Sequence, residues 1–470
     1  MKNYTNKIQN KKTNKNYNNQ NSENKKQSTK ESALVEITVD KLNMDLVGVT
    51  LINEKPRLVK NALPYELIEA KEEYVNGVGK VYNPVKIIEP SEFRVKPKCK
   101  IYEQCGNCNL LHMRYDRQCK EKVIMLKKYL HNVADIYIDD CVPSLDEGYR
   151  NKLHVAFGKN ASGIFLGFVN EQTHKLVEVK ECKMHGKWFS SLCQIIVEWA
   201  TKEALDVYIP SRQSGALRFA VARVIGDTLM LTIVSTKNIK DKMLSLYDKL
   251  SCSFSSVSLY LNVNNQKNSM VFSENFTHIA GQKSQSGELL GIKHSISPNS
   301  FFQTNEYITE KIYSKISDIV KASKCSTVLD LYSGIGITSM LFAKSGKKVV
   351  SIELVPEAVE NARQLARLNG LESKIKMLCG DCKDILPTLK HGNNTIFFVD
   401  PPRKGLGFSV CQDITKFRPQ TIIYLSCSPS SLAQDLSVFT HRGYSIKSIT
   451  PYDMFPNTRH VETLVVLERK

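Results

Sequence analysis

The stretch TVLDLYSGIGIT, residues 327–338, decides the fold of the C-terminal part of this chain, because a short apolar run leads directly into two closely spaced glycines. Gly334 and Gly336 allow a tight turn between a strand and a helix, where the backbone can approach a ligand. Further strand-like runs alternate with helical stretches, and these runs are 348–352, 375–379, 395–399 and 421–425. This alternation predicts an α/β fold, in which helices cover both faces of a parallel sheet.

An acidic residue follows each of the first four predicted strands: Asp330, Glu353, Asp381 and Asp400. A carboxylate at the end of the second strand can accept both hydroxyls of a ribose, and one after the third can accept an adenine amino group. Ser339 occupies the place of the third glycine of a dinucleotide-binding fingerprint, which counts against a pyrophosphate ligand. The four acids together resemble the S-adenosylmethionine-dependent methyltransferase fold and imply S-adenosylmethionine as the cofactor.

Two motifs with reactive side chains follow the fourth and fifth predicted strands. They are Asp400-Pro-Pro-Arg and Ser426-Cys-Ser-Pro429. The carboxyl ends of neighbouring parallel strands form the crevice in which open α/β sheets bind ligands. Cysteine is most often a small buried apolar residue. Cys427 instead lies between serines at a strand end, which presents its side chain to the crevice, and we interpret it as a nucleophile.

Five ordered motifs resemble the class I RNA (uracil-5-)-methyltransferase family. They are Ser297-Pro-Asn-Ser-Phe-Phe-Gln303-Thr-Asn305, the glycine loop, Asp400-Pro-Pro-Arg-Lys-Gly, Ser426-Cys-Ser-Pro429 and His460-Val-Glu-Thr463. The resemblance implies a Rossmann-like methyltransferase sheet, with Cys427 as nucleophile and Glu462 as base. It also implies a cofactor site formed by Gln303, Tyr332, Glu353, Asp381 and Asp400. The sequence departs from many members at Ile337 and Ser428, where they carry Asn.

The reaction gives both catalytic residues a purpose, because carbon 5 of uracil is a poor nucleophile. Addition of a thiolate at carbon 6 makes an enolate-like species, whose carbon 5 can attack a sulfonium methyl group. A base must then remove the proton left on carbon 5 so that elimination frees the enzyme. Glu462 taken alone would be interpreted as a surface residue that opens a strand, and the motif around it is what marks it as the base.

The composition is typical of a globular protein, and the net charge is large for this length. The chain has 470 residues, 42% of them hydrophobic, and a net charge of +18. Because a lysine-rich composition can also reflect biased genomic base content, the charge alone is weak support for a nucleic-acid partner. No run approaches the roughly 20 apolar residues of a membrane helix, and the basic N-terminus lacks the apolar stretch of a signal peptide. We expect a cytoplasmic protein.

Changes in pattern divide the chain into four parts. Residues 1–33 are predicted to be a disordered basic tail, because they cannot bury enough apolar surface to become ordered. Short β runs separated by turn residues predict a small β-barrel over residues 34–97, which resembles the TRAM domain, an RNA-binding barrel. We expect a central, mainly β domain over residues 98–290 and the methyltransferase domain over residues 291–470.

Cysteines gather at the start of the central part. Zinc accepts such thiolates as readily as an iron–sulfur cluster does, and His112 and His185 offer imidazoles as well. The resemblance to the ribosomal branch of the family implies a 4Fe–4S cluster held by Cys99, Cys105, Cys108 and Cys182. The other cysteines of this region, which are alternatives for the fourth ligand, are Cys119, Cys141 and Cys193.

The same branch suggests the substrate. Members with both a barrel and a cluster mostly modify 23S ribosomal RNA, so we expect 23S rRNA as the partner of a monomeric enzyme, with no membrane partner. The same reaction on tRNA is the alternative within the family. A noncatalytic RNA-binding ribosome-assembly factor is the alternative outside it, and a zinc-containing DNA methyltransferase is a weaker one.

Cationic side chains recur through the central part. They are Arg150, Lys152, Arg212, Arg218 and Arg223. Contacts with phosphate groups would explain them, and a solvated outer face of a sheet would explain them almost as well.

Overall fold

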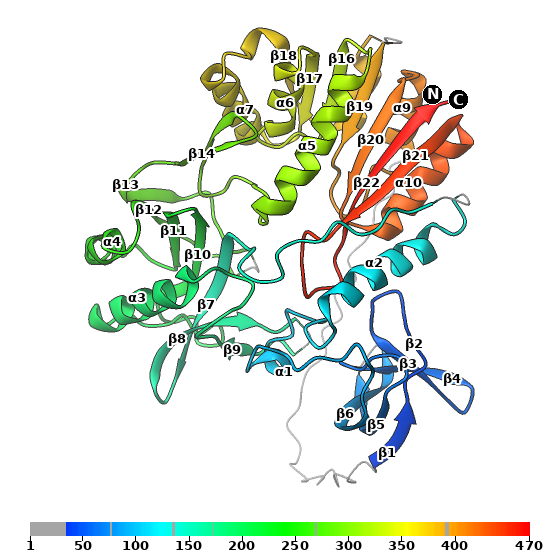
Figure 1. The fold of residues 1–470 in the computed structure, drawn as a ribbon. Helices are drawn as coiled ribbons and strands as arrows, with labels where there is room; N and C mark the ends of the chain where they lie inside the picture. Colours follow the sequence, from blue (N-terminus) through cyan, green and yellow to red (C-terminus); the bar gives the residue numbers. More distant parts are fainter. Residues whose placement is uncertain (1–33, 76–77, 134–136, 172, 268–269, 391–393) are drawn as a thin grey trace, which may run out of the picture.

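The computed structural model describes residues 34–470, apart from 76–77, 134–136, 172, 268–269 and 391–393. The tail predicted for residues 1–33 lies outside the described residues. The described chain is built around three larger sheets, which are N-terminal, central and C-terminal in sequence (Figure 1). None of its described helices combines the length and the apolar character that crossing a membrane would need.

The N-terminal sheet curls around a small apolar core that includes Ile37, Val59 and Ile68. Buried and exposed side chains alternate along its first strand, as expected where one face of a sheet is covered. Among the described residues the strand order is β1-β5-β6-β4-β3-β2. The strands are β1 (Leu34–Thr38), β2 (Lys41–Leu42), β3 (Gly48–Ile52), β4 (Lys55–Val59), β5 (Leu67–Val75) and β6 (Gly79–Glu89). Two helices then follow, α1 (Tyr102–Cys105) and α2 (Tyr115–Leu130).

The central sheet is covered on one face by α3 (Trp188–Lys202) and α4 (Leu244–Ser251), two helices that the sequence pattern does not predict. Its strands, in the order β13-β12-β11-β10-β7-β8-β9, are β7 (Lys152–Asn160), β8 (Gly163–Val169), β9 (Leu176–Glu178), β10 (Leu217–Ile225), β11 (Thr228–Ser235), β12 (Ser256–Val263) and β13 (Phe276–Gly281). Leu153 and Val155 of β7 point into the core beneath the helices. Lys152 and His154 therefore point to the opposite face.

The C-terminal sheet has the predicted alternation of strands and helices. Its order is β18-β17-β16-β19-β20-β22-β21, in which β16 to β20 run parallel and β22 is antiparallel to β20 and β21. The strands are β16 (Thr327–Leu331), β17 (Lys348–Glu353), β18 (Ile375–Cys379), β19 (Thr395–Val399), β20 (Thr421–Ser426), β21 (Tyr444–Tyr452) and β22 (Glu462–Arg469). The helices are α6 (Ile337–Lys344), α7 (Pro356–Leu368), α8 (Cys382–Ile385), α9 (Phe408–Lys416) and α10 (Pro429–His441).

Helices cover both faces of this sheet, as predicted. A hairpin, β14 (Gln285–Leu289) with β15 (Ile292–Ile296), and the helix α5 (Glu306–Ala322) lead into it from the central sheet. The hairpin, α5, α6 and α7 share one apolar core with Val328 and Ile396. The next residues along the same strands, Leu329 and Phe397, join α2, α9 and α10 in a second core on the other face. Three 3-10 turns complete these elements: η1 (Lys240–Lys242), η2 (Glu372–Lys374) and η3 (Leu386–Thr388).

Helix α2 carries a charged side chain into the interior. Lys122 is fully buried, and its ammonium donates to Asp453 Oδ1 at 2.5 Å and to the carbonyl of Phe455 at 3.3 Å. Gln118, one turn earlier, donates to Asn457 Oδ1 at 3.1 Å and accepts from the Asn457 amide at 3.0 Å. Helix α2 therefore holds the segment 453–457, which leads into β22.

Replacement of Lys122 by Met leaves Asp453 as an unpaired buried charge. Removal of one partner of a buried ion pair costs about 3–5 kcal/mol, and we expect urea denaturation to show a loss of that size in the free energy of unfolding. Lys127→Met, on an exposed face of the same helix, is the matched control and should have little effect. The double variant Lys122→Met/Asp453→Leu should recover much of the loss, because no charge stays buried. Equal stability of the two single variants would contradict this account.

Candidate functional site

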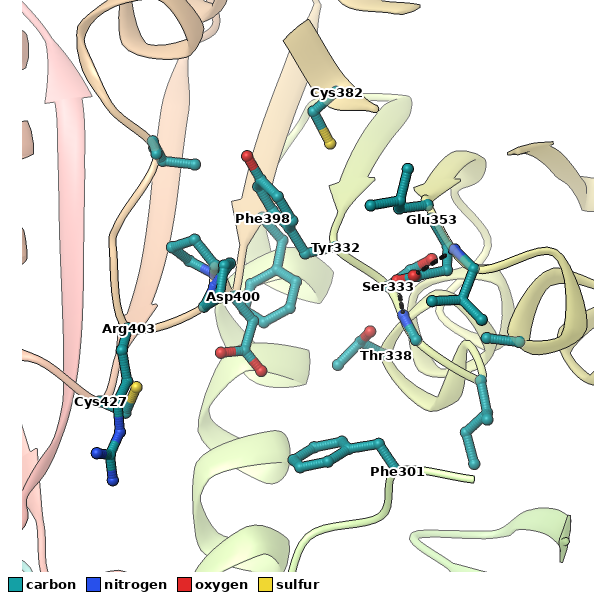
Figure 2. Close-up of a pocket in the computed structure, with 18 of the residues that line it drawn as sticks. Phe301, Tyr332, Ser333, Thr338, Glu353, Cys382, Phe398, Asp400, Arg403 and Cys427 are labelled. Atoms are coloured by element: carbon teal, nitrogen blue, oxygen red, sulfur yellow. Dashed lines mark hydrogen bonds between the residues drawn. The ribbon is translucent and has the colours of Figure 1, made fainter. Parts of the chain in front are cut away.

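A crevice of about 930 Å³ opens at the carboxyl ends of the parallel strands of the C-terminal sheet. It lies beside β16 and β19, where the strand order changes direction and where open α/β sheets bind ligands. The loops that follow β16 to β20, the start of β22 and the segment before α5 line it (Figure 2). The residues predicted to bind the cofactor or to react all line this crevice: Gln303, Tyr332, Glu353, Asp381, Asp400, Cys427 and Glu462. Their individual roles stay predictions.

The loop between β16 and α6 brings its backbone to the crevice. Gly334 and Gly336 have φ values of 56° and 82°, which favour glycine. A Cβ added to Gly336 would lie 3.2 Å from the Cβ of Ala362, so close packing also requires a glycine there. A Cβ added to Gly334 would meet no atom within 4 Å. The Gly334 backbone therefore borders open space that a ligand can fill.

Glu353 fastens this loop to the end of β17. Its carboxylate accepts backbone N–H bonds from Gly334 and Val355, each at 2.9 Å (Figure 2). Each carboxylate oxygen has a second lone pair, so Glu353 can accept further hydrogen bonds, including those of two ribose hydroxyls. Asp381 follows β18 and caps α8, where it accepts from the backbone N–H of Lys383 at 3.1 Å.

The structure corrects the placement of Asp330, which the sequence analysis counts among the acids at strand ends. Asp330 lies within β16, is fully buried and does not line the crevice. Its Oδ2 accepts from the hydroxyls of Thr338 at 2.7 Å and Ser339 at 2.5 Å, both in the first turn of α6. Burial raises the pKa of Asp330 to about 7. Ser339 thus replaces the third glycine of a dinucleotide fingerprint with a hydroxyl that secures the helix start.

The second half of the crevice brings together Cys427, Asp400 and Glu462. Cys427 follows β20, Asp400 follows the adjacent β19, and Glu462 opens β22 on the other side of β20. Burial raises the pKa of Cys427 to about 11, and the charges of Glu462 and Asp400 add to the effect. Burial also raises the pKa of Asp400 to about 7 and that of Glu462 well above its usual range. The charges of Glu462 and Asp400 therefore act on Cys427, and the charge of Asp400 acts on Glu462.

Two further crevice residues received no role from the sequence. Arg403 ends the quoted Asp400-Pro-Pro-Arg motif, and its side chain lies next to Cys427 (Figure 2). Burial raises the pKa of Cys427 and of Glu462, whereas the positive charge of Arg403 lowers both. Tyr313, on α5, also lines the crevice and has no sequence signal beyond the apolar periodicity of its helix.

Two family descriptions match the part of the chain that forms the crevice. Residues 382–470, which contain Asp400, Cys427 and Glu462, match the tRNA (Uracil-5-)-methyltransferase family. Residues 290–401, which contain the glycine loop, match the TRM5/TYW2 methyltransferase domain.

Relatives extend the similarity to almost the whole chain. An uncharacterized RNA methyltransferase of Halalkalibacterium halodurans is 31% identical over 450 residues, which cover 93% of this chain and 97% of that protein. One of Clostridium tetani is 33% identical over 433 residues, covering 89% and 93%. The crystal structure of Pyrococcus abyssi tRNA (uracil-54, C5)-methyltransferase in complex with S-adenosyl-L-homocysteine has a TM-score of 0.76 and 28% identity, covering 92% of this chain and 99% of that chain. This chain belongs to the RNA uracil-5-methyltransferase family.

The protein is therefore an S-adenosylmethionine-dependent RNA methyltransferase, and the predicted Rossmann-like methyltransferase fold is confirmed. The crevice of this methyltransferase fits the cofactor by its own geometry. The backbone at Gly334 borders open space, and Glu353 offers two carboxylate oxygens beside it. Asp381 and Asp400 line the same crevice. Carboxylates accept hydrogen bonds from hydroxyl groups and attract positive charge, so this lining suits a ligand that carries both.

The cysteine-rich segment of the methyltransferase borders a second, smaller pocket. Its lining includes four thiol side chains, those of Cys99, Cys105, Cys108 and Cys182. Burial raises the pKa of Cys108, and the charges of the other three thiols add to the effect, so the four act on one another. Within the described residues, no three His, Cys, Asp or Glu side chains are spaced so as to hold a metal ion.

The alternative ligands for this pocket have partners elsewhere. His112 shares a hydrogen bond with the Tyr102 hydroxyl at 2.6 Å, and His185 bonds the carbonyl of Lys152 at 3.1 Å. Cys193 packs in the central core, where burial and then the charge of Cys182 raise its pKa, but it does not line the pocket. The pair Cys119 and Cys141 lies beside Asp453, where the hydrogen bond to Cys141 lowers the pKa of Cys119. Cys182 is thus the fourth cysteine around the pocket.

Proposed function

We propose that this methyltransferase methylates carbon 5 of a uridine in 23S rRNA, with Cys427 as a covalent nucleophile and Glu462 as the base. The observation that carries the proposal is the meeting of these two side chains, which come from different strands, in one crevice with the glycine loop. A protein that only binds RNA needs neither a strand-end thiol nor a buried carboxyl beside it.

Cys427 attacks carbon 6 of the uracil as a thiolate. The new carbon–sulfur bond uses the sulfur electron pair, and the former double-bond pair moves to carbon 5 and the carbonyl oxygen at carbon 4. Bound S-adenosylmethionine supplies the sulfonium methyl group that this electron-rich carbon accepts. Two features of the chain favour the negative charge on sulfur. One is the guanidinium of Arg403, and the other is the N-terminus of α10, which begins two residues after Cys427.

Glu462 completes the reaction by taking the proton from carbon 5. The electrons of the broken carbon–hydrogen bond restore the ring double bond, and Cys427 leaves carbon 6 as a thiolate. Burial and the charge of Asp400 raise the pKa of Glu462, which makes its ionised form a stronger base than an exposed carboxylate. Glu462 is only 8% exposed, so bulk water has little access to the proton that it holds.

Each of the five residues predicted to bind S-adenosylmethionine is assigned a part of the cofactor. Glu353 accepts the ribose hydroxyls, Asp381 accepts the adenine amino group, and Tyr332 packs beside the base from its position after β16. Gln303 and Asp400 are assigned to the reactive end of the cofactor, since the charge of Asp400 acts on Cys427. The shared lining of one crevice by these five residues supports the assignment.

The substrate is the finer part of the proposal. The barrel-like N-terminal sheet and the four-cysteine pocket accompany the methyltransferase sheet in this chain, a combination that supports 23S rRNA. The second candidate is tRNA, which is favoured by the similarity to the Pyrococcus abyssi enzyme across 99% of that chain. In either RNA the uridine must leave the base stack to enter the crevice, which costs a few kcal/mol and favours a loop over a duplex.

A 4Fe–4S cluster held by Cys99, Cys105, Cys108 and Cys182 belongs to the same proposal. The chemistry of four thiols around one pocket suits a soft metal centre. In such a cluster each cysteine binds a different iron, so all four thiols that line the pocket would have a partner. The cluster would pin the start of the central part.

Methyl transfer from labelled S-adenosylmethionine tests the function directly. We expect label in 5-methyluridine of unmodified 23S rRNA, and none with Cys427→Ala, because no thiolate can then activate carbon 5. Cys411→Ala, a buried cysteine of α9 outside the crevice, is the matched control and should keep activity. Label in bulk tRNA alone would transfer the proposal to tRNA. No label in either RNA would favour the noncatalytic alternative.

Glu462→Gln should trap the covalent adduct. Without a base the methylated uridine cannot lose its proton, so the Cys427–RNA bond persists and product formation falls by about 10²-fold or more. A slower-migrating band on denaturing gels, absent from Glu462→Gln/Cys427→Ala, is the expected result. If the single variant accumulates no more adduct than the wild type, another residue is the base.

Anaerobic purification tests the cluster. We expect about four irons and four acid-labile sulfides for each chain, and a visible absorption band that is lost in Cys108→Ser. Cys141→Ser, which changes a buried cysteine away from the pocket, should retain both. Stoichiometric zinc without sulfide would overturn the cluster and leave the methyl-transfer proposal intact.

A further inference from the structure

Three of the five cations of the central part gather at the border between the central sheet and the crevice. Lys152 of β7 is the cross-strand partner of Arg223 of β10, so both side chains lie on the face that α3 and α4 leave open. Arg150, two residues before Lys152, donates from Nε to the Lys152 carbonyl at 3.1 Å. Arg212, by contrast, lies exposed in the loop before β10.

Direct hydrogen bonds tie this group to the crevice wall. Arg223 donates from Nη2 to the carbonyl of Ser300 at 3.2 Å. Asn151, the neighbour of Lys152, donates its backbone N–H to the Thr304 carbonyl at 2.9 Å and its side-chain amide to the Gln303 carbonyl at 3.2 Å. Because Ser300 and Gln303 line the crevice, the cations stand at its rim.

The group lacks negative charge. In the described part of the chain, none of Arg150, Lys152 and Arg223 forms a salt bridge. The one acid whose charge acts on Arg223 is Glu306, which already accepts from Asn151 at 2.8 Å. Arg223 is only 4% exposed, and its Nη1 has no hydrogen-bond partner. Burial, followed by the charges of Arg223 and Arg150, lowers the pKa of Lys152 to about 8.

A solvated outer face does not explain these side chains. Arg223 is buried, with its guanidinium 5.4 Å from the centroid of the Phe302 ring, so it supports the crevice wall. Arg150 and Lys152 are half-buried without an acidic partner, which costs stability.

The positive charge also continues toward the nucleophile. Burial, followed by the charges of Arg403, Arg459, Lys122 and Arg150, lowers the pKa of His460 to about 4. The charges of Arg403 and Arg150 thus both act on His460. We name the residues Arg403, Arg150 and Lys152 the cationic track; Arg223 lies buried behind it and is not part of it.

We propose that the cationic track binds successive phosphates of the RNA strand on one side of the extruded uridine. The inference rests on the proposed function, because it takes the strand that enters the crevice to be RNA. Phosphates match half-buried Lys and Arg side chains that have no acidic partner at a crevice rim.

An aromatic pair lies beyond Lys152 on the same face of the central sheet. His154 is exposed two residues beyond Lys152, and its ring lies 5.1 Å from the ring of Phe219 on β10. Unpaired bases stack on such rings irrespective of sequence. The strand would therefore leave the crevice over Lys152 with a base against His154, so single-stranded RNA fits this face better than a duplex does.

Binding of a short fluorescein-labelled oligouridylate over a range of salt concentrations tests the proposal without methyl transfer. Lys152→Gln should weaken binding about five- to tenfold at low salt and reduce the slope of log K against log salt by about 0.7, the value for one phosphate contact of a single strand. Lys159→Gln, which removes the same charge at the exposed far end of β7, is the matched control and should change neither.

A second readout separates binding from structure. Because Lys152 is half-buried without a partner, Lys152→Gln should keep or raise the Tm, whereas a purely structural lysine would lower it. The KM for RNA should rise while kcat at saturating RNA stays close to the wild-type value. Two results for Lys152→Gln would overturn the track. One is a slope of log K against log salt equal to that of Lys159→Gln, and the other is weaker binding explained by a lowered Tm. Methylation with an unchanged slope would overturn the track alone, whereas a Lys152-dependent slope without methylation would overturn only the proposed function.

Discussion

The buried ion pair between Lys122 and Asp453 is the contact on which the geometry of the reactive crevice depends. Both side chains are fully removed from water, and such a pair persists only when each partner is held in place. It joins α2, from the N-terminal third of the chain, to the segment that leads into β22 and Glu462. The Tyr149 hydroxyl adds a bond to the carbonyl of Pro456 at 3.1 Å. The position of the proposed base is therefore set by residues that precede the methyltransferase sheet.

The thiol and carboxyl groups of the crevice favour their protonated forms. Burial raises the pKa of Cys427, Asp400 and Glu462, so each favours its neutral form, with the guanidinium of Arg403 acting against the trend. A positively charged ligand beside these groups favours their ionised forms. In the proposed reaction, the same electrostatics would link cofactor binding to the ionisation of Cys427 and Glu462. The proposed cationic track begins at Arg403 in the crevice and continues to Arg150 and Lys152 beyond it, where positive charge suits the phosphates of RNA.

Much of the C-terminal part could be predicted because its signals are local. A strand, a glycine turn and a helix succeed one another within a dozen residues. The polar side chains that follow the parallel strands then lie at the same edge of the sheet. The central part was harder. Helix α3 contains Ile195, Ile196 and Val197 in succession, a β-branched run that resembles a strand, and tertiary burial against the sheet overrides that preference. Asp330 was predicted to follow the first strand, but it lies within β16, one residue before its end. The sequence pattern shows where a strand ends only to within a residue or two.

The sequence by itself determined the α/β class of the C-terminal sheet, the family and the residues that meet at its carboxyl edge, because parallel strands bring their ends together whatever the rest of the chain does. Only the tertiary structure decided the contacts that join distant segments. Cys182 faces Cys99, Cys105 and Cys108, while the nearer Cys119 turns toward Cys141. Lys122 is buried and Lys152 stands unpaired at the crevice rim, although the sequence shows both simply as lysines. Burial and charge pairing depend on which segments pack together, and no local pattern contains that information.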